Sequence, residues 1–417
     1  MAERVAAGTS KTSLTAAFLR QSWWVQVLQI WLASRVVATL GFIWAASAQG
    51  PTPWSAAGHP NYFDFLDTWD AEWYRRIFYN GLGHDPGYPT HLPTGPEGAV
   101  QQNAWAFMPG FPLLIRLLTM LTGGLIEWKF LSQIVSLLLS FAVALVIYQL
   151  LRIKLDHKTA LWSVTLIGFW CASPVLQTGY AESLGLLLLA GGLQQLMRHK
   201  YVAAIPWLVG LSITRPGMVS FAAMLAGMWV VRWVKDRRGT EGFPILERWK
   251  LAALTALSAL LGLAWPIFAW IVTGRRDAYT VTELAWRVVD PNAHLVLFEG
   301  WLGLGERLWG AFWAPMFVLL CMALAAWLLF TKPMRQLGNE LRLWTAAYLL
   351  YIFAVFNPQS STYRILLMAF PLAAGFAVWS RDWKLWQKLF WICLMIAGQV
   401  LWLATCWIFA HPDFTPP

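Results

Sequence analysis

A short acidic and aromatic segment, residues 64–77, carries side chains suited to acid–base chemistry. If this segment is helical, one face is an apolar stripe, and Asp70 lies at the edge of that stripe, near Tyr74. A carboxylate there is partly desolvated, which raises its pKa toward the range that suits a general base. We therefore expect Asp70 to be catalytic, and Asp67, one turn earlier, to bind substrate or to be the alternative base. The pattern also fits a structural interpretation, in which Asp67 or Asp64 caps the helix and Asp70 satisfies a local donor.

Two arginines at the ends of apolar segments, Arg215 and Arg364, form a second signal. An ionised guanidinium near the apolar part of a membrane costs free energy unless it is paired, so such residues often mark a ligand or a partner. A lipid phosphate at headgroup depth would satisfy either arginine through paired hydrogen bonds. The alternatives are a salt bridge with Glu182 or Asp70, or snorkelling to lipid headgroups. Glu182 itself starts an apolar run and fits either an ion pair or a hydrogen bond to a sugar hydroxyl.

Aromatic residues accompany these charged positions. Trp73 and Tyr74 follow Asp70 and could hold a sugar ring, although anchoring at the membrane surface explains them equally well. Tyr363 directly precedes Arg364, and we expect it to contact substrate together with that arginine.

Metal and nucleophile chemistry find little support in the sequence. The histidines His59, His84 and His91 match no metal-ligand spacing, and all four cysteines lie inside apolar runs. The chain has no Gly-rich loop for phosphate and no motif for a serine or cysteine nucleophile. We therefore expect neither a metal nor another cofactor.

The composition is that of a membrane protein. Apolar residues make up 58% of the 417 residues and charged residues 12%, so long uncharged runs must be buried, and a soluble core of this length cannot absorb them all. Many of the 29 tryptophans lie near the ends of apolar runs, which suits the interface between membrane and water. The net charge of +10 comes from basic residues between the apolar runs, so it indicates topology and not a nucleic-acid partner.

Apolar length predicts about eleven membrane-spanning helices, some of them short. The expected spans are 22–47, 128–151, 159–174, 180–197, 201–214, 216–233, 251–273, 310–330, 343–357, 364–379 and 389–410. The first run begins about twenty residues into the chain and is long enough to span, so we expect no cleavable signal peptide. Residues 105–125 are apolar but contain two prolines and an arginine. If this segment lies on the membrane surface, most basic loops fall on the side of the N-terminus, as the positive-inside rule prefers.

This topology predicts a single transmembrane domain over residues 1–417 with two long extracytoplasmic loops. The first, 48–127, carries Asp70 and the surface segment, and the second is 274–309. Plausible sugar contacts in the second loop, with no spacing that singles one out, are Asp277, Tyr279, Glu283, Asp290 and His294.

Four motifs occur in the order and rough spacing of one known family. They are Trp69-Asp70-Ala71-Glu72 followed by Tyr74, Ile77 and Gly81; Ala106-Phe107-Met108-Pro109-Gly110-Phe111-Pro112-Leu113; Gly179-Tyr180-Ala181-Glu182-Ser183-Leu184, preceded by Ser173-Pro174; and Thr214-Arg215-Pro216-Gly217-Met218-Val219-Ser220. The segment Tyr363-Arg364, with Pro371, is similar to the C-terminal part of that family. The chain thus resembles the GPI mannosyltransferase II (PIG-V) family of GT-C glycosyltransferases.

The resemblance implies an all-α polytopic membrane protein of the GT-C fold, with juxtamembrane helices in the first extracytoplasmic loop and a catalytic aspartate, here Asp70. It implies a polyprenyl-phosphate-mannose donor and transfer with inversion to an α-mannoside, of α-1,6 linkage by analogy. The chain departs from the family at Arg75-Arg76, in its shorter loops and in having no ER-retrieval tail. These differences favour a bacterial member in the plasma membrane, acting on another glycolipid or glycan; a eukaryotic member would lie in the ER membrane.

The sequence therefore predicts a mannosyltransferase whose partners are a lipid-linked sugar donor, a glycolipid or glycan acceptor and membrane lipids. Asp70 would take the proton of the acceptor hydroxyl, and the arginines would hold the lipid phosphate. Two alternatives stay open. The protein could be a flippase or transporter for lipid-linked sugars, or it could be a GT-C transferase that uses another lipid-linked sugar.

Overall fold

The computed structural model describes residues 18, 20–52, 58–83, 87–288 and 290–409, and in these residues the protein is helical, with two isolated β-bridges. The α-helices and the shorter 3₁₀ or π-helical turns (η) are, in chain order, α2 (Trp23–Ala48), α3 (Tyr62–Leu66), α4 (Asp70–Asn80), η1 (Ala104–Ala106), α5 (Gly110–Leu121), α6 (Trp128–Leu151), α7 (His157–Gly168), η2 (Ser173–Gln177), α8 (Glu182–Met197), α9 (Tyr201–Ser212), α10 (Met218–Arg237), α11 (Ile245–Thr273), α12 (Ala278–Leu284), α13 (Glu299–Trp309), α14 (Ala314–Phe330), α15 (Lys332–Gln336), α16 (Asn339–Val355), α17 (Thr362–Ile365), η3 (Leu366–Ala369), α18 (Pro371–Trp379), α19 (Leu385–Trp402) and η4 (Leu403–Trp407).

The helical prediction is confirmed, because each of the eleven expected spans coincides with a helix or a helix pair. Within the described residues, five helices are long and apolar enough to cross a membrane, and up to seven spans result if each of two bent pairs counts as one. The bent pairs are α13 with α14, at 113°, and the α17–η3 segment with α18, at 71°. The remaining predicted spans form helices of 17 residues or fewer, such as α7 and α9 with 12 each. The protein is an all-helical integral membrane protein.

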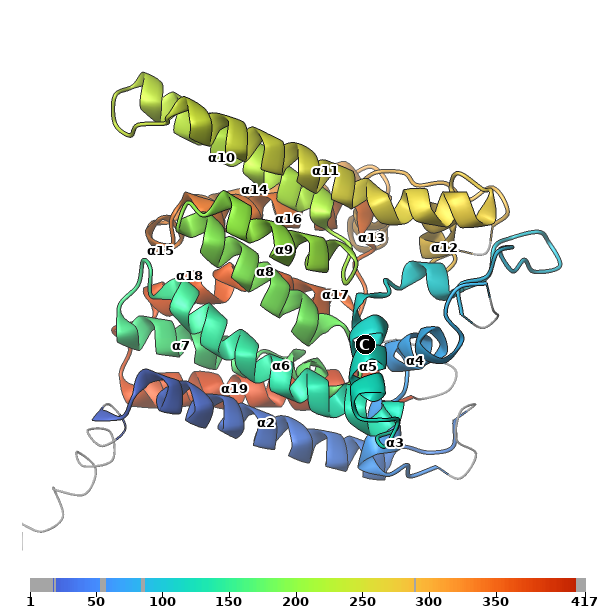
Figure 1. Cartoon of the computed structure of the whole chain (residues 1–417). Helices are drawn as coiled ribbons and strands as arrows, with labels where there is room; N and C mark the ends of the chain where they lie inside the picture. Colours follow the sequence, from blue (N-terminus) through green and yellow to red (C-terminus); the bar gives the residue numbers. More distant parts are fainter. Residues whose placement is uncertain (1–17, 19, 53–57, 84–86, 289, 410–417) are drawn as a thin grey trace, which may run out of the picture.

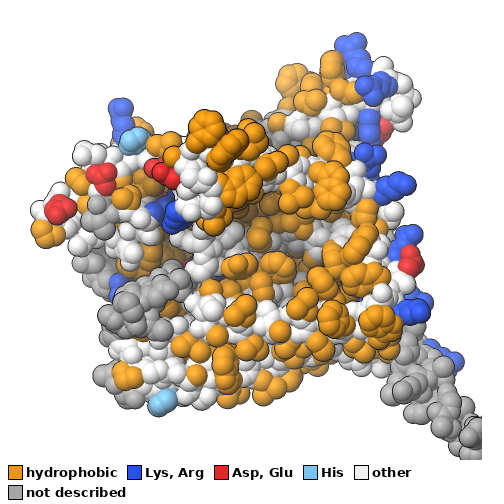
Figure 2. Space-filling model, turned by 180° about the vertical axis from the view of Figure 1, so that it is seen from behind, with side chains coloured by type: hydrophobic (Ala, Val, Ile, Leu, Met, Phe, Trp, Pro, Cys, Tyr) orange, Lys and Arg blue, Asp and Glu red, His pale blue; other side chains and the backbone are white. Residues whose placement is uncertain are grey.

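The two ends of the helix bundle differ in content (Figure 1). Helices α3, α4, α5 and α12 gather at one end, whereas the turns after α6, α8, α10 and α18 lie at the other. Exposed basic side chains occupy those turns: Arg152, Arg198, Arg237 and Arg381. Figure 2 shows Lys and Arg along one edge of the molecule and apolar side chains over most of the face between the two ends. This separation of charge follows the pattern from which the topology was predicted.

The doubtful segment 105–125 contains one short helix, α5, of 12 residues. At 1.5 Å per residue, this helix is about 18 Å long, well short of the roughly 30 Å apolar core of a bilayer. Its buried side includes Phe111 and Ile115, while Leu117 and Leu121 are exposed. The length and the exposed apolar side chains suit a helix that lies along a membrane surface.

One buried charge within the bundle has a structural role. Arg35, on α2, donates hydrogen bonds to the carbonyl oxygens of Ser173 at 2.8 Å and Gly168 at 3.0 Å. Both oxygens lie at the break between α7 and η2, where carbonyls lack helical partners. Arg35 therefore stabilises this break, and the ligand chemistry must be sought among other charged residues.

Candidate active site

The catalytic candidate Asp70 is the first residue of α4, and the turn before it has an unusual backbone. Trp69 has φ 58° and ψ −123°, a conformation that a bulky residue adopts only where its surroundings hold it. Its indole nitrogen donates to the carbonyl oxygen of Trp407 at 3.1 Å, and the backbone N–H of Asp70 donates to the hydroxyl oxygen of Tyr180 at 3.2 Å. These contacts fix the backbone at Asp70 and so the direction in which its side chain points.

The structure corrects one expectation for this segment, because residues 64–77 do not form one helix. Helix α3 ends at Leu66 and α4 begins at Asp70, so the residues between them break the helical register. Asp67 and Asp70 therefore do not follow one helical face. The physical reason is the positive φ of Trp69, which a continuous α-helix cannot contain.

Asp70 and three charged side chains from distant segments form one connected group. Arg364 lies with one nitrogen, Nη1, 2.5 Å from Asp70 Oδ2 and 2.9 Å from Glu182 Oε1. Arg215 Nη1 donates to the same Glu182 oxygen at 3.0 Å. The four residues lie at the start of α4, at the start of α8, between α9 and α10, and in α17. We call Asp70, Glu182, Arg215 and Arg364 the charge cluster.

The charge cluster is electrically balanced and mostly buried. The side chains of Glu182 and Asp70 are 1% and 15% exposed, and those of Arg364 and Arg215 are 10% and 13% exposed. Burial raises the pKa of Asp70 above its ordinary value, and the guanidinium of Arg364 opposes that rise. Asp70 thus has a raised pKa, a cation beside it and little water around it, which are the surroundings that suit a general base.

The ion pairs leave hydrogen-bonding capacity unused. Glu182 Oε2 and Arg364 Nε are buried and have no partner within the described part of the chain. A guanidinium has five N–H donors, and the ion pairs of both arginines involve Nη1 alone. The ion-pair interpretation of the arginines is therefore observed, and it does not exhaust what they can bind.

Glycines allow the close approach of these elements. A Cβ on Gly185 would lie 2.7 Å from Arg215 Cγ, so Arg215 can cross α8 only because residue 185 has no side chain. A Cβ on Gly110 would lie 2.5 Å from Thr214 Oγ1, and the Gly110 N–H donates to the carbonyl oxygen of Ile213 at 2.6 Å. The start of α5 thereby fixes the turn that carries Arg215. The motif that contains Gly110 and the motif that contains Arg215 are thus in direct contact.

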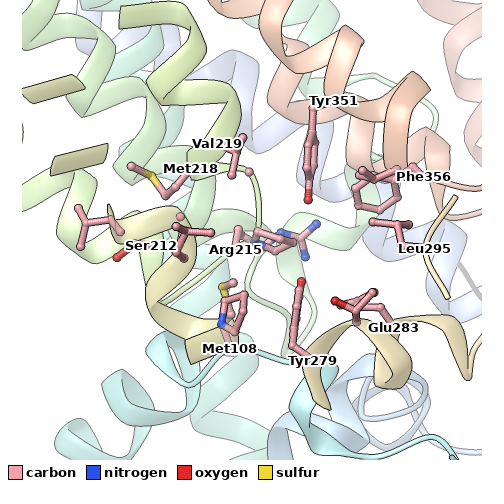
Figure 3. Close-up of a pocket in the computed structure, with 18 of the residues that line it drawn as sticks. Met108, Ser212, Arg215, Met218, Val219, Tyr279, Glu283, Leu295, Tyr351 and Phe356 are labelled. Carbon is pink, nitrogen blue, oxygen red and sulfur yellow. The ribbon is translucent and has the colours of Figure 1, made fainter. Parts of the chain in front are cut away.

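A cavity of about 240 Å³ adjoins the charge cluster at Arg215. In Figure 3 the Arg215 guanidinium points into it, the hydroxyls of Tyr351 and Tyr279 point in from opposite sides, and the Glu283 carboxylate lies across from the arginine. Burial raises the pKa of Glu283 to about 6, against the attraction of Arg287. Much of the remaining wall is apolar and comes from α10, α11 and α16. The cavity thus combines a largely apolar wall, the two cations Arg215 and Arg287, and one carboxylate.

Asp67 lies in a different environment from the charge cluster. Its carboxylate accepts hydrogen bonds from Arg75 at 2.9 Å and from the indole of Trp128 at 3.0 Å. Burial raises its pKa to about 6, with Arg75 the main opposing influence. It lines a separate cavity of about 770 Å³, together with Trp69 and Glu72.

The three aromatic candidates differ in their surroundings. Trp73 stacks on Phe107 with ring centroids 5.7 Å apart, within a cluster of aromatic side chains. Tyr74 is buried and contacts the same Phe107 edge-on. Tyr363 is half exposed, and the contact found at this residue is its carbonyl oxygen accepting the Trp170 indole N–H at 2.9 Å. Tyr74 lies near enough to interact electrostatically with Arg215, Glu182 and Asp70.

Sequence reasoning missed two tyrosines at the site. Tyr180 is fully buried, bonds the Asp70 backbone and lies under Arg364, whose guanidinium carbon is 5.2 Å from the ring centroid. Tyr351 projects into the cavity from α16. The position of Tyr180 two residues before Glu182 was an available signal, whereas Tyr351 lies within an apolar run and offered none.

Metal ligation finds no support in the described residues, where no group of three or more His, Cys, Asp or Glu side chains could hold an ion. His84 lies outside the described residues, so its position is not part of this statement.

The solved structures to which the chain is similar include those of archaeal oligosaccharyltransferases. The apo enzyme of Archaeoglobus fulgidus aligns over 90% of this chain and 55% of its own, with 12% identity and a TM-score of 0.43. The A. fulgidus enzyme AglB in complex with an inhibitory peptide and a dolichol-phosphate aligns over 92% and 55%, with 11% identity and a TM-score of 0.41. The chain spans about half the length of these proteins, and the scores are too low to assign a function.

Sequence comparisons add no relative: no family model matches the chain, and no curated protein matches it. The structure therefore defines an all-helical membrane protein with a buried charge cluster beside a largely apolar cavity.

Proposed function

We propose that the protein is a membrane glycosyltransferase of the GT-C class that transfers mannose from polyprenyl-phosphate-mannose to a glycolipid or glycan acceptor. The observation that carries the proposal is the meeting of Asp70 with Arg364, Glu182 and Arg215 beside an apolar cavity. A lipid-phosphate sugar matches such a site, because it joins an apolar chain, an anion and a polar sugar. The resemblance to the PIG-V family supports mannose as the sugar and an α-mannoside, of α-1,6 linkage, as the product.

In the proposed reaction, Asp70 accepts the proton of the acceptor hydroxyl while that oxygen attacks the anomeric carbon of the donor. The bond between the anomeric carbon and the phosphate oxygen breaks, and its electron pair leaves with the phosphate. A single displacement from the opposite face inverts the configuration. Arg215 stabilises the anionic leaving group, because it reaches the cavity and has unused donors, and Arg364 holds Asp70 in place.

Glu182 has a positioning role in this proposal. Its Oε1 receives both arginines and so fixes the distance between the base and the phosphate site. The charge cluster lies at the bundle end that carries α3, α4 and α5, which we assign to the extracytoplasmic face of a bacterial plasma membrane (Figure 1). Donor and acceptor then meet at headgroup height.

The test is a transfer assay of the purified protein in liposomes, with polyprenyl-phosphate-mannose and a panel of glycolipid and glycan acceptors. We expect an α-mannoside product from the wild type and its loss in Asp70→Asn. The matched control is Asp382→Asn, an exposed aspartate paired with Arg381 at the other end of the bundle, which should keep full activity. If the wild type moves the lipid-linked sugar across the membrane and forms no glycoside, the flippase alternative replaces the proposal.

A further inference from the structure

Helix α12 lines the cavity with three polar residues, Tyr279, Thr280 and Glu283, and packs into the protein through its opposite side. Ala278, Val281 and Thr282 are buried, and the Thr282 hydroxyl accepts a hydrogen bond from the side chain of Asn103 at 3.0 Å. This contact ties the second long loop to the first. Tyr279 and Glu283, one helical turn apart, both line the cavity. Their direction is thus set by the packing of the opposite side of α12.

Glu283 has no ion-pair partner within 4.0 Å among the described residues. Its neighbour on the helix face, Tyr279, lines the cavity beside it, while Arg287 and Arg215 attract it from a longer range. An ionised carboxylate only accepts hydrogen bonds, and it has about four acceptor positions, so most of its capacity stays available toward the cavity. A partly buried carboxylate in a largely apolar wall needs donors to offset its desolvation.

Sugar hydroxyls are suitable donors at this position. The carboxylate lies across the cavity from Arg215, the proposed phosphate site (Figure 3). In a lipid-phosphate sugar the sugar ring is attached directly to the phosphate, so a phosphate at Arg215 places the ring in the same cavity. Two oxygens of one carboxylate can accept from neighbouring hydroxyls, and such charge-assisted hydrogen bonds are about twice as strong as neutral ones.

We propose that Glu283 is a specificity-determining residue that binds vicinal hydroxyls of a neutral donor sugar. The inference rests on the proposed function, because it places a lipid-phosphate sugar in this cavity. The two residues then have different roles: Arg215 recognises the phosphate common to all such donors, and Glu283 distinguishes one sugar from another.

The experiment compares wild type with Glu283→Gln, which keeps the shape of the side chain and removes its charge. Polyprenyl-phosphate-mannose and polyprenyl-phosphate-glucose compete in one transfer assay, and the ratio of their kcat/KM values is measured. We expect this ratio to fall roughly tenfold or more in Glu283→Gln, the range for loss of a hydrogen bond to a charged group. The matched control is Glu299→Gln, an exposed carboxylate of the same loop, which should leave the ratio unchanged.

A binding measurement decides the case in which the variant transfers nothing. Both proteins are titrated with polyprenyl-phosphate-mannose and with polyprenyl phosphate alone. We expect Glu283→Gln to lose affinity for the mannosyl lipid and to keep its affinity for the bare lipid phosphate. Equal loss for both lipids, or an unchanged sugar ratio in the transfer assay, would overturn the role of Glu283. If the wild type binds the mannosyl lipid but forms no product, the proposed function is contradicted. The binding comparison between wild type and Glu283→Gln still tests the role of Glu283 in that case.

Discussion

Asp67 and Asp70 are near neighbours in sequence, yet their surroundings differ in the origin of their cations. The partner of Asp67 is Arg75, from the next turns of the chain, with a side chain that is 43% exposed. The partner of Asp70 is Arg364, which lies almost three hundred positions away and is 10% exposed. A buried carboxylate paired with a local, partly exposed arginine can form in many folds, whereas a pair between distant and mostly buried residues exists only in the complete fold. The comparison favours Asp70 over Asp67 as the base of the proposed reaction.

The largest expected effect comes from exchanging the two carboxylates for amides one at a time. Asp70→Asn should lower the rate of sugar transfer by roughly 10²- to 10⁴-fold, the usual contribution of a general base. Asp67→Asn should change it less than about tenfold, because Asp67 belongs to another cavity. Product formation by the two variants under single-turnover conditions measures the difference. The reverse order of effects would make Asp67 the base.

Substitution of the two arginines should affect different properties: stability for Arg364 and donor binding for Arg215. Arg364→Ala leaves two carboxylates without their shared cation, and loss of one partner from a buried ion pair costs about 3–5 kcal/mol of stability. Arg215→Ala removes the cation that reaches the cavity, so it should mainly raise the KM for the donor. Thermal unfolding in detergent and donor titrations separate the two results. Unchanged donor kinetics in both variants would remove the phosphate site from the proposal.

A smaller effect is expected from the contact that lets Arg215 cross α8. Gly185→Ala would introduce a Cβ 2.7 Å from Arg215 Cγ and 2.9 Å from Met368 Cε, so the arginine must shift. We expect the kcat/KM for the donor to fall about tenfold, because displacement of a binding group by a fraction of an ångström weakens its hydrogen bonds. Gly303→Ala is the control, since a Cβ there meets nothing within 4 Å. Equal kinetics of the two variants would show that Arg215 has freedom to relax.

The smallest effect concerns the pH dependence of stability at Asp67. Burial raises its pKa in the folded protein from 3.8 to about 6. A raised pKa stabilises the folded state below the unfolded value, and this contribution is lost as the pH rises from about 4 through 6. The unfolding temperature of wild type minus that of Asp67→Asn should therefore decrease between pH 4 and pH 7. A difference that stays constant over this interval would contradict the burial of Asp67.

Sequence reasoning was accurate where the physical cause is local. The helices of the predicted spans follow from runs of apolar residues, and the two prolines and Arg116 set the segment 105–125 apart from those spans. The pairing of Arg215 and Arg364 with Glu182 and Asp70 was one of the stated alternatives, because unpaired charges are costly in a membrane. The cost of an unpaired charge predicts that each arginine has a partner, whereas the choice of partner depends on the complete fold.

The features that sequence reasoning missed depend on contacts across the chain. The helix break at Trp69 is held by Trp407 and supported by Tyr180, and both lie more than a hundred residues away. Glu283 was one of five polar candidates in its loop until the packing of α12 directed it toward Arg215. No periodicity in the sequence contains such tertiary information.

The position of Arg364 in the chain determines when the charge cluster can form during biosynthesis. Of the four residues in the charge cluster, Arg364 is the last to leave the ribosome. Until α17 has entered the membrane, a buried Asp70 lacks its strongest cation and favours the protonated form, which accepts no proton. Under the proposed function, a partly inserted chain therefore has no working base, and sugar transfer requires that membrane insertion be nearly complete.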